Sequence, residues 1–260
     1  KGVTLTSAGT EVYNQSKAIC EMVYNMKKSI SGETDEDKVL SVSNNYSIIG
    51  KDMFIALYNK YSGKHCKFRI QEASVSEAIE NVASGVSEIG LVRFPEDNRD
   101  MHLRTMKRQG VEYHRMSLKR MCVVIGEKNP FYNMEANTIK LEHLTQFPFA
   151  GYYDEESDVI FEKLLPRTKR LKENISIGSV DHLKEVIRNT DAFTLDVYKE
   201  KEFNSEWYEG VRYIPITPTI WCEFGWIKKK ERELSPIADE YIHDLDRHFK
   251  EFWKDRDDIV

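Results

Sequence analysis

The stretch Val39-Leu40-Ser41-Val42-Ser43-Asn44-Asn45-Tyr46-Ser47 decides the fold class, together with the pattern of residues 48–61 that follows it. Its first four residues form a short apolar run, which is typical of a strand. The next residues, Asn44 to Ser47, form a polar turn. Apolar side chains then recur at helical spacing, at Ile49, Met53, Phe54, Leu57 and Tyr61. The stretch therefore predicts a strand followed by a helix.

The same alternation continues along the chain. In the first half we predict a strand over 68–72, a helix over 75–83 with Gly85 as its C-cap, and a strand over 88–94. In the second half we predict strands over 147–152, 174–178 and 192–197, with helices over 154–165 and 180–189 between them. Strands that alternate with helices form a parallel sheet with right-handed crossovers. The predicted fold class is therefore α/β.

The chain between and after these two sets predicts two lobes. Residues 111–116 and 118–125 are neighbouring extended runs, and Asn129-Pro130 then leads into a new segment, which predicts a crossover. Two more strands and a last helix follow, over 212–215, 219–227 and 235–254. The strand over 219–227 can return the chain to the first set. We therefore predict one lobe from residues 38–127 and 222–260, and a second lobe from residues 128–221.

A long amphipathic helix is predicted before the lobes, over residues 6–31. Thr6 or Ser7 can cap it, and one stripe of its surface is apolar (Val12, Ile19, Met22, Val23, Met26 and Ile30). A lone helix of this length needs a cover for its stripe. The cover is either a partner helix from a second chain or the chain's own globular part. The acidic segment 31–37 then predicts a hinge between the helix and the lobes.

Composition narrows the class of protein. The 260 residues include 40% hydrophobic residues, enough to bury a core of two lobes. The 43 acidic and 38 basic residues give a formal charge of −5, so the chain as a whole is not an electrostatic footprint for nucleic acid. No apolar run approaches the ~20 residues of a membrane-spanning helix, and the chain start lacks the layout of a secretion signal. We therefore expect a soluble, cytoplasmic protein without membrane partners.

Cysteines and histidines predict no metal site. The four cysteines (Cys20, Cys66, Cys122 and Cys222) lie far apart and form no C-x-x-C pair, which favours reduced, structural thiols. The seven histidines are equally dispersed. His243 and His248 on the last helix are separated by five residues, which places them on different sides of the helix.

The residues Gly2-Val3-Thr4-Leu5-Thr6-Ser7-Ala8-Gly9 resemble the gly-val-x-leu-thr-x-ala-gly segment of LysR-type transcriptional regulators. The resemblance extends over the strand and helix pattern of essentially the whole chain. It implies that residues 1–5 end a winged helix-turn-helix domain, and that residues 6–31 are the linker helix through which two chains pair. The remainder is then an effector-binding domain with a clamshell fold similar to that of periplasmic binding proteins.

The resemblance also implies partners. The DNA-reading helices would lie upstream of Lys1, so we expect this fragment not to bind operator DNA by itself. Linker helices pair antiparallel in the family, and the effector domains associate side by side into homodimers and often homotetramers. A redox-sensing cysteine pair occurs in some relatives, whereas buried cysteines are more often inert packing.

Candidate effector-binding residues follow from the fold, because ligands of open parallel sheets bind beyond the carboxyl ends of the strands. These positions are Ser43, Asn44, Asn45, Tyr46, Ser47, Arg93 and Phe94 in the first lobe, and Gly151, Tyr152, Tyr153, Ser179, Phe193 and Thr194 in the second, with Trp221 on the returning strand. Hydroxyls, amides and helix N-termini favour a small anionic organic effector, with Arg93 as a clamp for its carboxylate. No cofactor or metal is required.

Each of these residues also has a purely structural interpretation. The serine and asparagine side chains can cap helices, the aromatic rings can pack, and Arg93 can form a salt bridge. Segment 189–196 is bulkier and more polar than the glycine-rich turn that relatives usually have there. Tyr152, Tyr153 and Phe193 can therefore fill the cleft and leave a small pocket or none.

The sequence leaves three hypotheses for the function. We find no nucleophile elbow, phosphate-binding loop or cluster of metal ligands, and therefore expect no enzyme and no catalytic residues. The first hypothesis is a ligand-responsive transcriptional regulator, of which this fragment is the dimerisation and effector-binding part. The second is a solute-binding protein of the same clamshell fold, and the third is a dimerisation module without a ligand.

Overall fold

The computed structural model of the chain describes residues 6, 8–9, 12–13, 15–16, 19, 23, 38–64, 66–135, 137–152, 156–165, 171–197 and 209–252. Within the predicted N-terminal helix, the described positions 8–9, 12–13, 15–16, 19 and 23 are helical. The side chains of Val12, Ile19 and Val23 are 63%, 55% and 41% exposed. The rest of the predicted helix and the predicted domain end at 1–5 lie outside the described residues.

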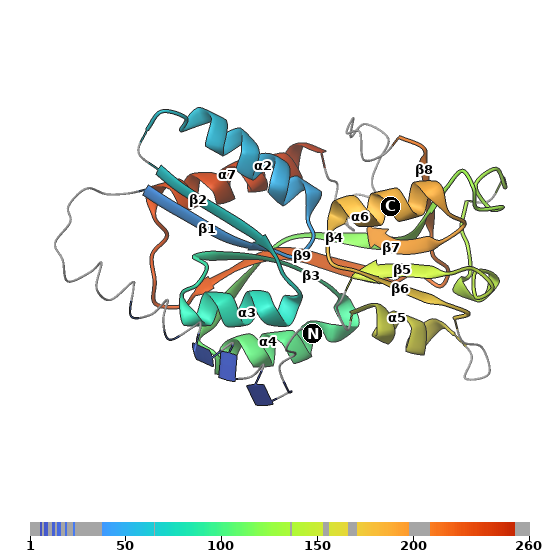
Figure 1. Ribbon diagram of the computed structural model, residues 1–260, viewed down its shortest axis with the longest axis horizontal. Coiled ribbons are helices and arrows are strands. Elements are labelled where there is room, and N and C mark those ends of the chain that lie inside the picture. The colour runs from blue at the N-terminus through green and yellow to red at the C-terminus, as the bar shows by residue number, and fades with distance from the viewer. Residues whose placement is uncertain are drawn as a thin grey trace, which may run out of the picture.

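One mixed sheet of nine strands forms the centre of the molecule, in the order β2-β1-β3-β9-β4-β7-β5-β6, with β8 paired to β4 (Figure 1). The strands are β1 (Lys38–Asn44), β2 (Cys66–Glu72), β3 (Ile89–Pro95), β4 (Val111–Gly126), β5 (Phe149–Tyr152), β6 (Asn174–Ile177), β7 (Phe193–Val197), β8 (Val211–Pro215) and β9 (Trp221–Lys229). β1 runs parallel to β2 and β3, and β5 runs parallel to β6 and β7. The two predicted sets of parallel strands are therefore confirmed.

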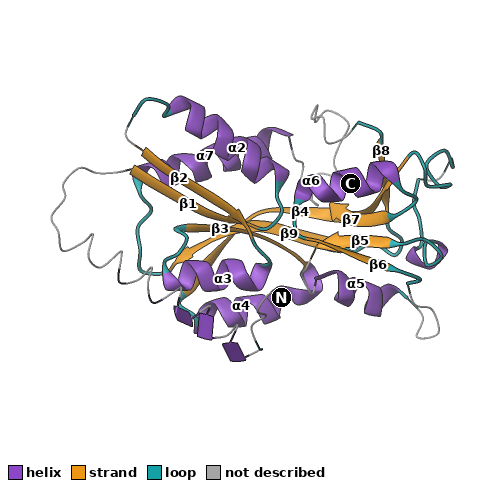
Figure 2. Ribbon diagram, in the orientation of Figure 1, coloured by secondary structure: helices purple, strands orange, loops and turns teal. Residues whose placement is uncertain are grey.

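Helices cover both faces of this sheet (Figure 2). They are α2 (Ile48–Lys60), α3 (Val75–Ser84), α4 (Arg99–Arg108), α5 (Glu156–Leu164), α6 (Val180–Asn189) and α7 (Pro236–Phe252). We call β1, β2, β3, β9, α2, α3, α4 and α7 the first lobe, and β5 to β8, α5 and α6 the second lobe. In the first lobe α2 and α7 lie on one face of the sheet and α3 and α4 on the other, while α6 and α5 flank the second lobe in the same way.

Strand β4 joins the two lobes. Its first part, up to Arg120, pairs antiparallel with β9, and its last part, from Met121, pairs with β7 and β8. The sequence predicted neighbouring extended runs over 111–116 and 118–125, and both lie in this one strand of 16 residues, with a β-bulge between Arg115 and Ser117. The predicted crossover after Asn129-Pro130 stays a prediction. The predicted lobe boundaries at 127/128 and 221/222 stay predictions.

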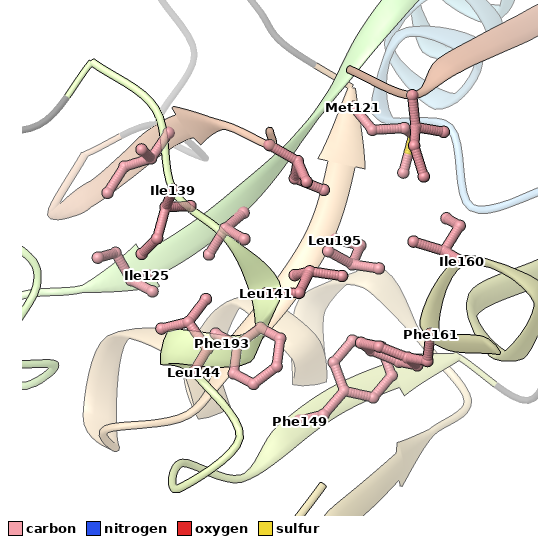
Figure 3. Packing of buried hydrophobic residues seen from close by; sticks show 14 of the residues in the cluster. Met121, Ile125, Ile139, Leu141, Leu144, Phe149, Ile160, Phe161, Phe193 and Leu195 are labelled. Atoms are coloured by element: carbon pink, nitrogen blue, oxygen red, sulfur yellow. The ribbon is translucent and has the colours of Figure 1, made fainter. Parts of the chain in front are cut away.

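Each lobe has its own hydrophobic core. Figure 3 shows part of the second-lobe core, in which the Phe193 ring lies 5.5 Å from the Phe149 ring and 6.5 Å from the Phe161 ring. The first-lobe core is built around α2 and α7, where the buried Tyr241 hydroxyl donates a 2.8 Å hydrogen bond to the Gly50 carbonyl. The two lobes therefore pack around separate hydrophobic clusters.

Local signals fix several helix ends as predicted. Helix α3 begins with a capping box, in which Ser74 and Glu77 bond each other's backbone N–H groups. It ends at Gly85 with a φ of 82°, in the left-handed region that glycine adopts without strain. Helix α4 was not predicted. It buries only His102 and Met106, and its many charged residues conceal the apolar period.

Candidate functional site

A cavity lies where the two lobes meet beside β4, with a volume of about 40 Å³, which is room for roughly three water molecules. The turn before α2 contributes Asn45, Tyr46 and Ser47 to its wall. The first-lobe sheet contributes Arg93, and the second lobe contributes Tyr152 and Thr194 among others. A smaller cavity of about 30 Å³ shares Arg93, Tyr152 and Thr194 with it and is also lined by Gly151. Seven of the predicted effector-binding residues therefore line one or both cavities.

Two tyrosines close the space between the lobes at this point. The rings of Tyr46 and Tyr152 are stacked, with centroids 3.8 Å apart and an interplanar angle of 3°. Ile48 and Val180 complete this apolar contact. Tyr46 adopts a φ of 49°, a left-handed conformation that is uncommon for an aromatic residue and recurs at functional sites. Burial raises the pKa of Tyr152 well above its ordinary value, so its phenol stays neutral.

An ion pair joins the lobes next to this stack. The Arg93 guanidinium of β3 donates a hydrogen bond to the Asp196 carboxylate of β7, and the side chains are only 18% and 13% exposed. Both residues line the larger cavity. Arg93 thus lies at the predicted place, but a carboxylate of the protein itself already occupies it. The structure thus shows Arg93 in a salt bridge, and its role as an effector clamp stays a prediction.

Polar contacts join the lobes on both faces of the sheet. On the α2 face, the Glu72 carboxylate accepts a 3.3 Å hydrogen bond from the Val180 N–H at the start of α6. Burial raises the pKa of Glu72, and the Val180 hydrogen bond opposes that shift. On the α4 face, Glu156 lies 2.7 Å from both the His102 ring and the Asn98 amide. The lobes are therefore held in one closed arrangement around the cavity.

Comparison with known proteins identifies this arrangement. No protein-family model matches the sequence, and no curated protein resembles it in sequence. Solved structures do resemble it. The effector-binding domain of QuiR in complex with shikimate is 12% identical, covers 83% of this chain and 99% of that chain, and gives a TM-score of 0.57. The chain has the fold of LysR-type effector-binding domains.

Longer LysR-type structures extend the comparison. HinK, a LysR family transcriptional regulator from Pseudomonas aeruginosa, is 16% identical over 95% of this chain and 83% of that chain, with a TM-score of 0.51. Full-length CbnR, solved with its target DNA, is 14% identical over 95% of this chain and 83% of that chain, with a TM-score of 0.55. At such identities the likeness establishes the fold, and the predicted two-lobed clamshell is confirmed.

Several predicted site residues of this LysR-type fold point away from both cavities and serve the first lobe. The Ser43 hydroxyl is buried between Ser87 and Asn81, with hydrogen bonds of 2.8 and 3.0 Å. The Asn44 side chain braces the turn through both backbone groups of Ser47. Phe94 is fully buried in a first-lobe core on the α3 and α4 side. Neighbouring residues of a strand point to opposite faces, so only some of them can reach a cavity.

Predicted site residues of the second lobe also make structural contacts and line neither cavity. Phe193 is fully buried in the second-lobe core, and Ser179 caps α6 by accepting a hydrogen bond from the His182 N–H. Trp221 begins β9 and lines neither of the two cavities. Tyr153 lies outside the described residues. Phe193 and Ser179 thus have structural roles in the second lobe, and effector binding by either residue stays a prediction.

Other residues that line the larger cavity were not predicted. Ser117, Lys119 and Cys222 come from β4 and β9, and Asp196 comes from β7. Their strand positions alternate with core residues, and the sequence pattern alone does not tell which face meets the second lobe. The bulge at Ser117 adds to this difficulty because it shifts the alternation by one residue.

The thiols and the remaining titratable groups offer little further chemistry. Cys66, Cys122 and Cys222 form no disulfide within the described residues. Burial raises the pKa of Cys222 to about 12, so this thiol is a weak nucleophile. Within the described part of the chain, no group of three or more His, Cys, Asp or Glu side chains is placed to hold a metal ion. Among the same residues, no helix is both long and apolar enough to cross a bilayer.

Proposed function

We propose that this chain is the dimerisation and effector-binding part of a LysR-type transcriptional regulator. The observation that carries the proposal is the cavity lined by both lobes and closed by the Tyr46–Tyr152 stack and the Arg93–Asp196 pair. A ligand that contacts both lobes binds one relative arrangement of them better than others. It therefore shifts the population toward that arrangement, and this shift is the signal.

The effector is a small organic anion in this proposal, and the protein needs no cofactor or metal. Among the described residues, three cationic side chains line the cavity (Arg93, Lys119 and Lys184), against one acidic side chain, Asp196. The surplus of positive charge favours a negatively charged ligand. The protein acts by binding rather than by catalysis.

Promoter DNA and a second copy of the chain are the macromolecular partners. Val12, Ile19 and Val23 recur at seven- and four-residue steps and are exposed, which suits pairing with another helix. A pair of chains, or a tetramer, would transmit the lobe arrangement to DNA-binding domains on promoter DNA in the cytoplasm. This apolar stripe favours a regulator over a solute-binding protein, and the cavity favours it over a dimerisation module without a ligand.

Thermal unfolding with a panel of small carboxylates, amino acids and aromatic acids tests the proposal. A ligand at about 100 times its Kd stabilises the folded chain by about 2.7 kcal/mol. For a chain of this size the midpoint then rises by about 5–10 °C. Thr194→Phe, which fills the cavity wall, should abolish the shift, whereas Thr219→Phe at an exposed position should not. No shift with any compound of the panel would refute an effector-responsive regulator.

A further inference from the structure

The carboxylate of Glu156 joins the lobes on the face of the sheet that carries α4 and α5 (Figure 1). Glu156 is the first residue of α5, in the second lobe. Its Oε2 atom accepts a 2.7 Å hydrogen bond from the Asn98 amide, and its Oε1 atom lies 2.7 Å from Nε2 of His102. Both oxygen atoms of this carboxylate therefore contact the first lobe.

The three side chains of this contact are shielded from water. Asn98 is 7% and His102 is 4% exposed, and the Glu156 side chain is 13% exposed. Hydrogen bonds to a charged group are strong, and a low local dielectric strengthens them further. The Lys163–Asp97 pair joins the same elements, but its side chains are 50% and 48% exposed, and exposed pairs contribute little. Glu156 rather than this pair therefore holds α5 against the first lobe.

The contact lies at the edge of the candidate site. Glu156 lines the smaller cavity together with Arg93. Strand β3 ends at Pro95 and runs directly into the short helix η1 (Glu96–Asn98) and then into α4, which carries His102. One continuous segment of the first lobe therefore carries both the Arg93 ion pair and the two partners of Glu156.

We propose that Glu156, Asn98 and His102 form a latch that keeps the lobes closed and controls access to both cavities. With the latch closed, the cavities have volumes of about 40 and 30 Å³, which is room for roughly three and two water molecules. A larger molecule therefore enters only when the latch releases. This inference concerns the lobes themselves and is independent of the proposed effector.

Alkylation of Cys222 by iodoacetamide measures how often the latch releases. Cys222 is 2% exposed and lines both cavities, and iodoacetamide is too large for either of them while the lobes are closed. Glu156→Ala should raise the labelling rate of Cys222 by about ten-fold or more, because even one hydrogen bond to a charged group changes an equilibrium constant by about that factor. Glu156→Gln keeps an accepting oxygen atom and should give an intermediate rate.

Two controls separate lobe opening from other causes. Glu162→Gln, at an exposed position of the same helix, should leave the labelling rate of Cys222 unchanged. Cys122 is 0% exposed, belongs to a second-lobe core cluster and lines neither cavity, so its labelling reports loss of the folded lobe. Mass spectrometry of the digested chain measures each cysteine separately. In Glu156→Ala the rate of Cys222 should rise much more than that of Cys122.

Two results would overturn the latch. The first is a Cys222 labelling rate in Glu156→Ala equal to that in Glu162→Gln. The second is an equal increase for Cys222 and Cys122, which would show that Glu156 supports the stability of the chain and not the closure of the lobes. Neither result bears on effector binding, which thermal unfolding with the ligand panel tests separately.

Discussion

Removing the Asp196 carboxylate should strongly destabilise the closed arrangement of the lobes. In Asp196→Asn the Arg93 guanidinium keeps its charge in a site where the side chain is only 18% exposed. Breaking a buried ion pair from one side costs roughly 3–5 kcal/mol, and exposed pairs are worth about 0–1 kcal/mol. The remaining exposure of this pair places its loss at about 2–4 kcal/mol. The unfolding midpoint would fall by about 4–16 °C.

Urea unfolding at pH 7 measures this loss in a double-mutant cycle of Arg93→Met, Asp196→Asn and the double variant. The double variant should be clearly more stable than the sum of the two single losses predicts, because each single loss already includes the loss of the same ion pair. Asp246→Asn on α7 is the matched control, since its pair with Lys250 is a surface pair with side chains 41% and 74% exposed. A loss in Asp196→Asn no larger than that of the control would refute a lobe-joining role for the pair.

Three further changes test other parts of the structure. Gly126→Ala should lower the free energy of unfolding by about 1–3 kcal/mol in urea, because the added Cβ would lie 2.1 Å from the Ile187 carbonyl oxygen. An unchanged free energy of unfolding would contradict that close approach. Phe193→Ala should cost about 3–5 kcal/mol in thermal unfolding, because the ring is fully buried; a small loss would return Phe193 to the list of site residues. Burial raises the pKa of Glu72 above its ordinary 4.5, so the stability from this shift is full below that value and is lost as pH rises through the higher folded pKa. The wild type should therefore gain stability relative to Glu72→Gln as pH is lowered from about 6.5 to 4, and a pH-independent difference would contradict the raised pKa.

Elements with strong local signals could be predicted from the sequence. Helix α6 has the predicted bounds, because Ser179 caps its start and its apolar residues keep a helical period. The crossing of β4 between the lobes could not be predicted, because pairing partners come from distant parts of the chain. The pattern of residues 111–125 fits one bulged strand as well as two separate strands.

The residues of the site, too, could be predicted from the sequence only in part. The turn before α2 was predicted to border the crevice, because turns that follow strands of a parallel sheet meet at one edge. Within it, Asn45 and Tyr46 reach the cavity while Asn44 braces the turn, a difference set by the direction of each side chain. Asp196 and Ser117 were missed because an acidic residue near a strand end and a serine within a strand have many possible roles.

A ligand in the cavity and the Arg93–Asp196 ion pair can both shift the equilibrium between open and closed lobes. A carboxylate bound in the cavity would stabilise the closed lobes by about 1.5–3 kcal/mol per charged hydrogen bond, which is comparable to what the Arg93–Asp196 pair provides. Reversing a closure equilibrium from 1:99 to 99:1 requires about 5.5 kcal/mol, so neither contribution alone acts as a complete switch. In Asp196→Asn the lobes should therefore open more readily, and closure should depend more strongly on the ligand. A ligand that binds only the closed lobes should therefore raise the unfolding midpoint less in this variant than in Asp246→Asn at the same concentration, because a smaller closed population weakens the apparent affinity. Equal increases would show that the pair and the ligand act on separate states.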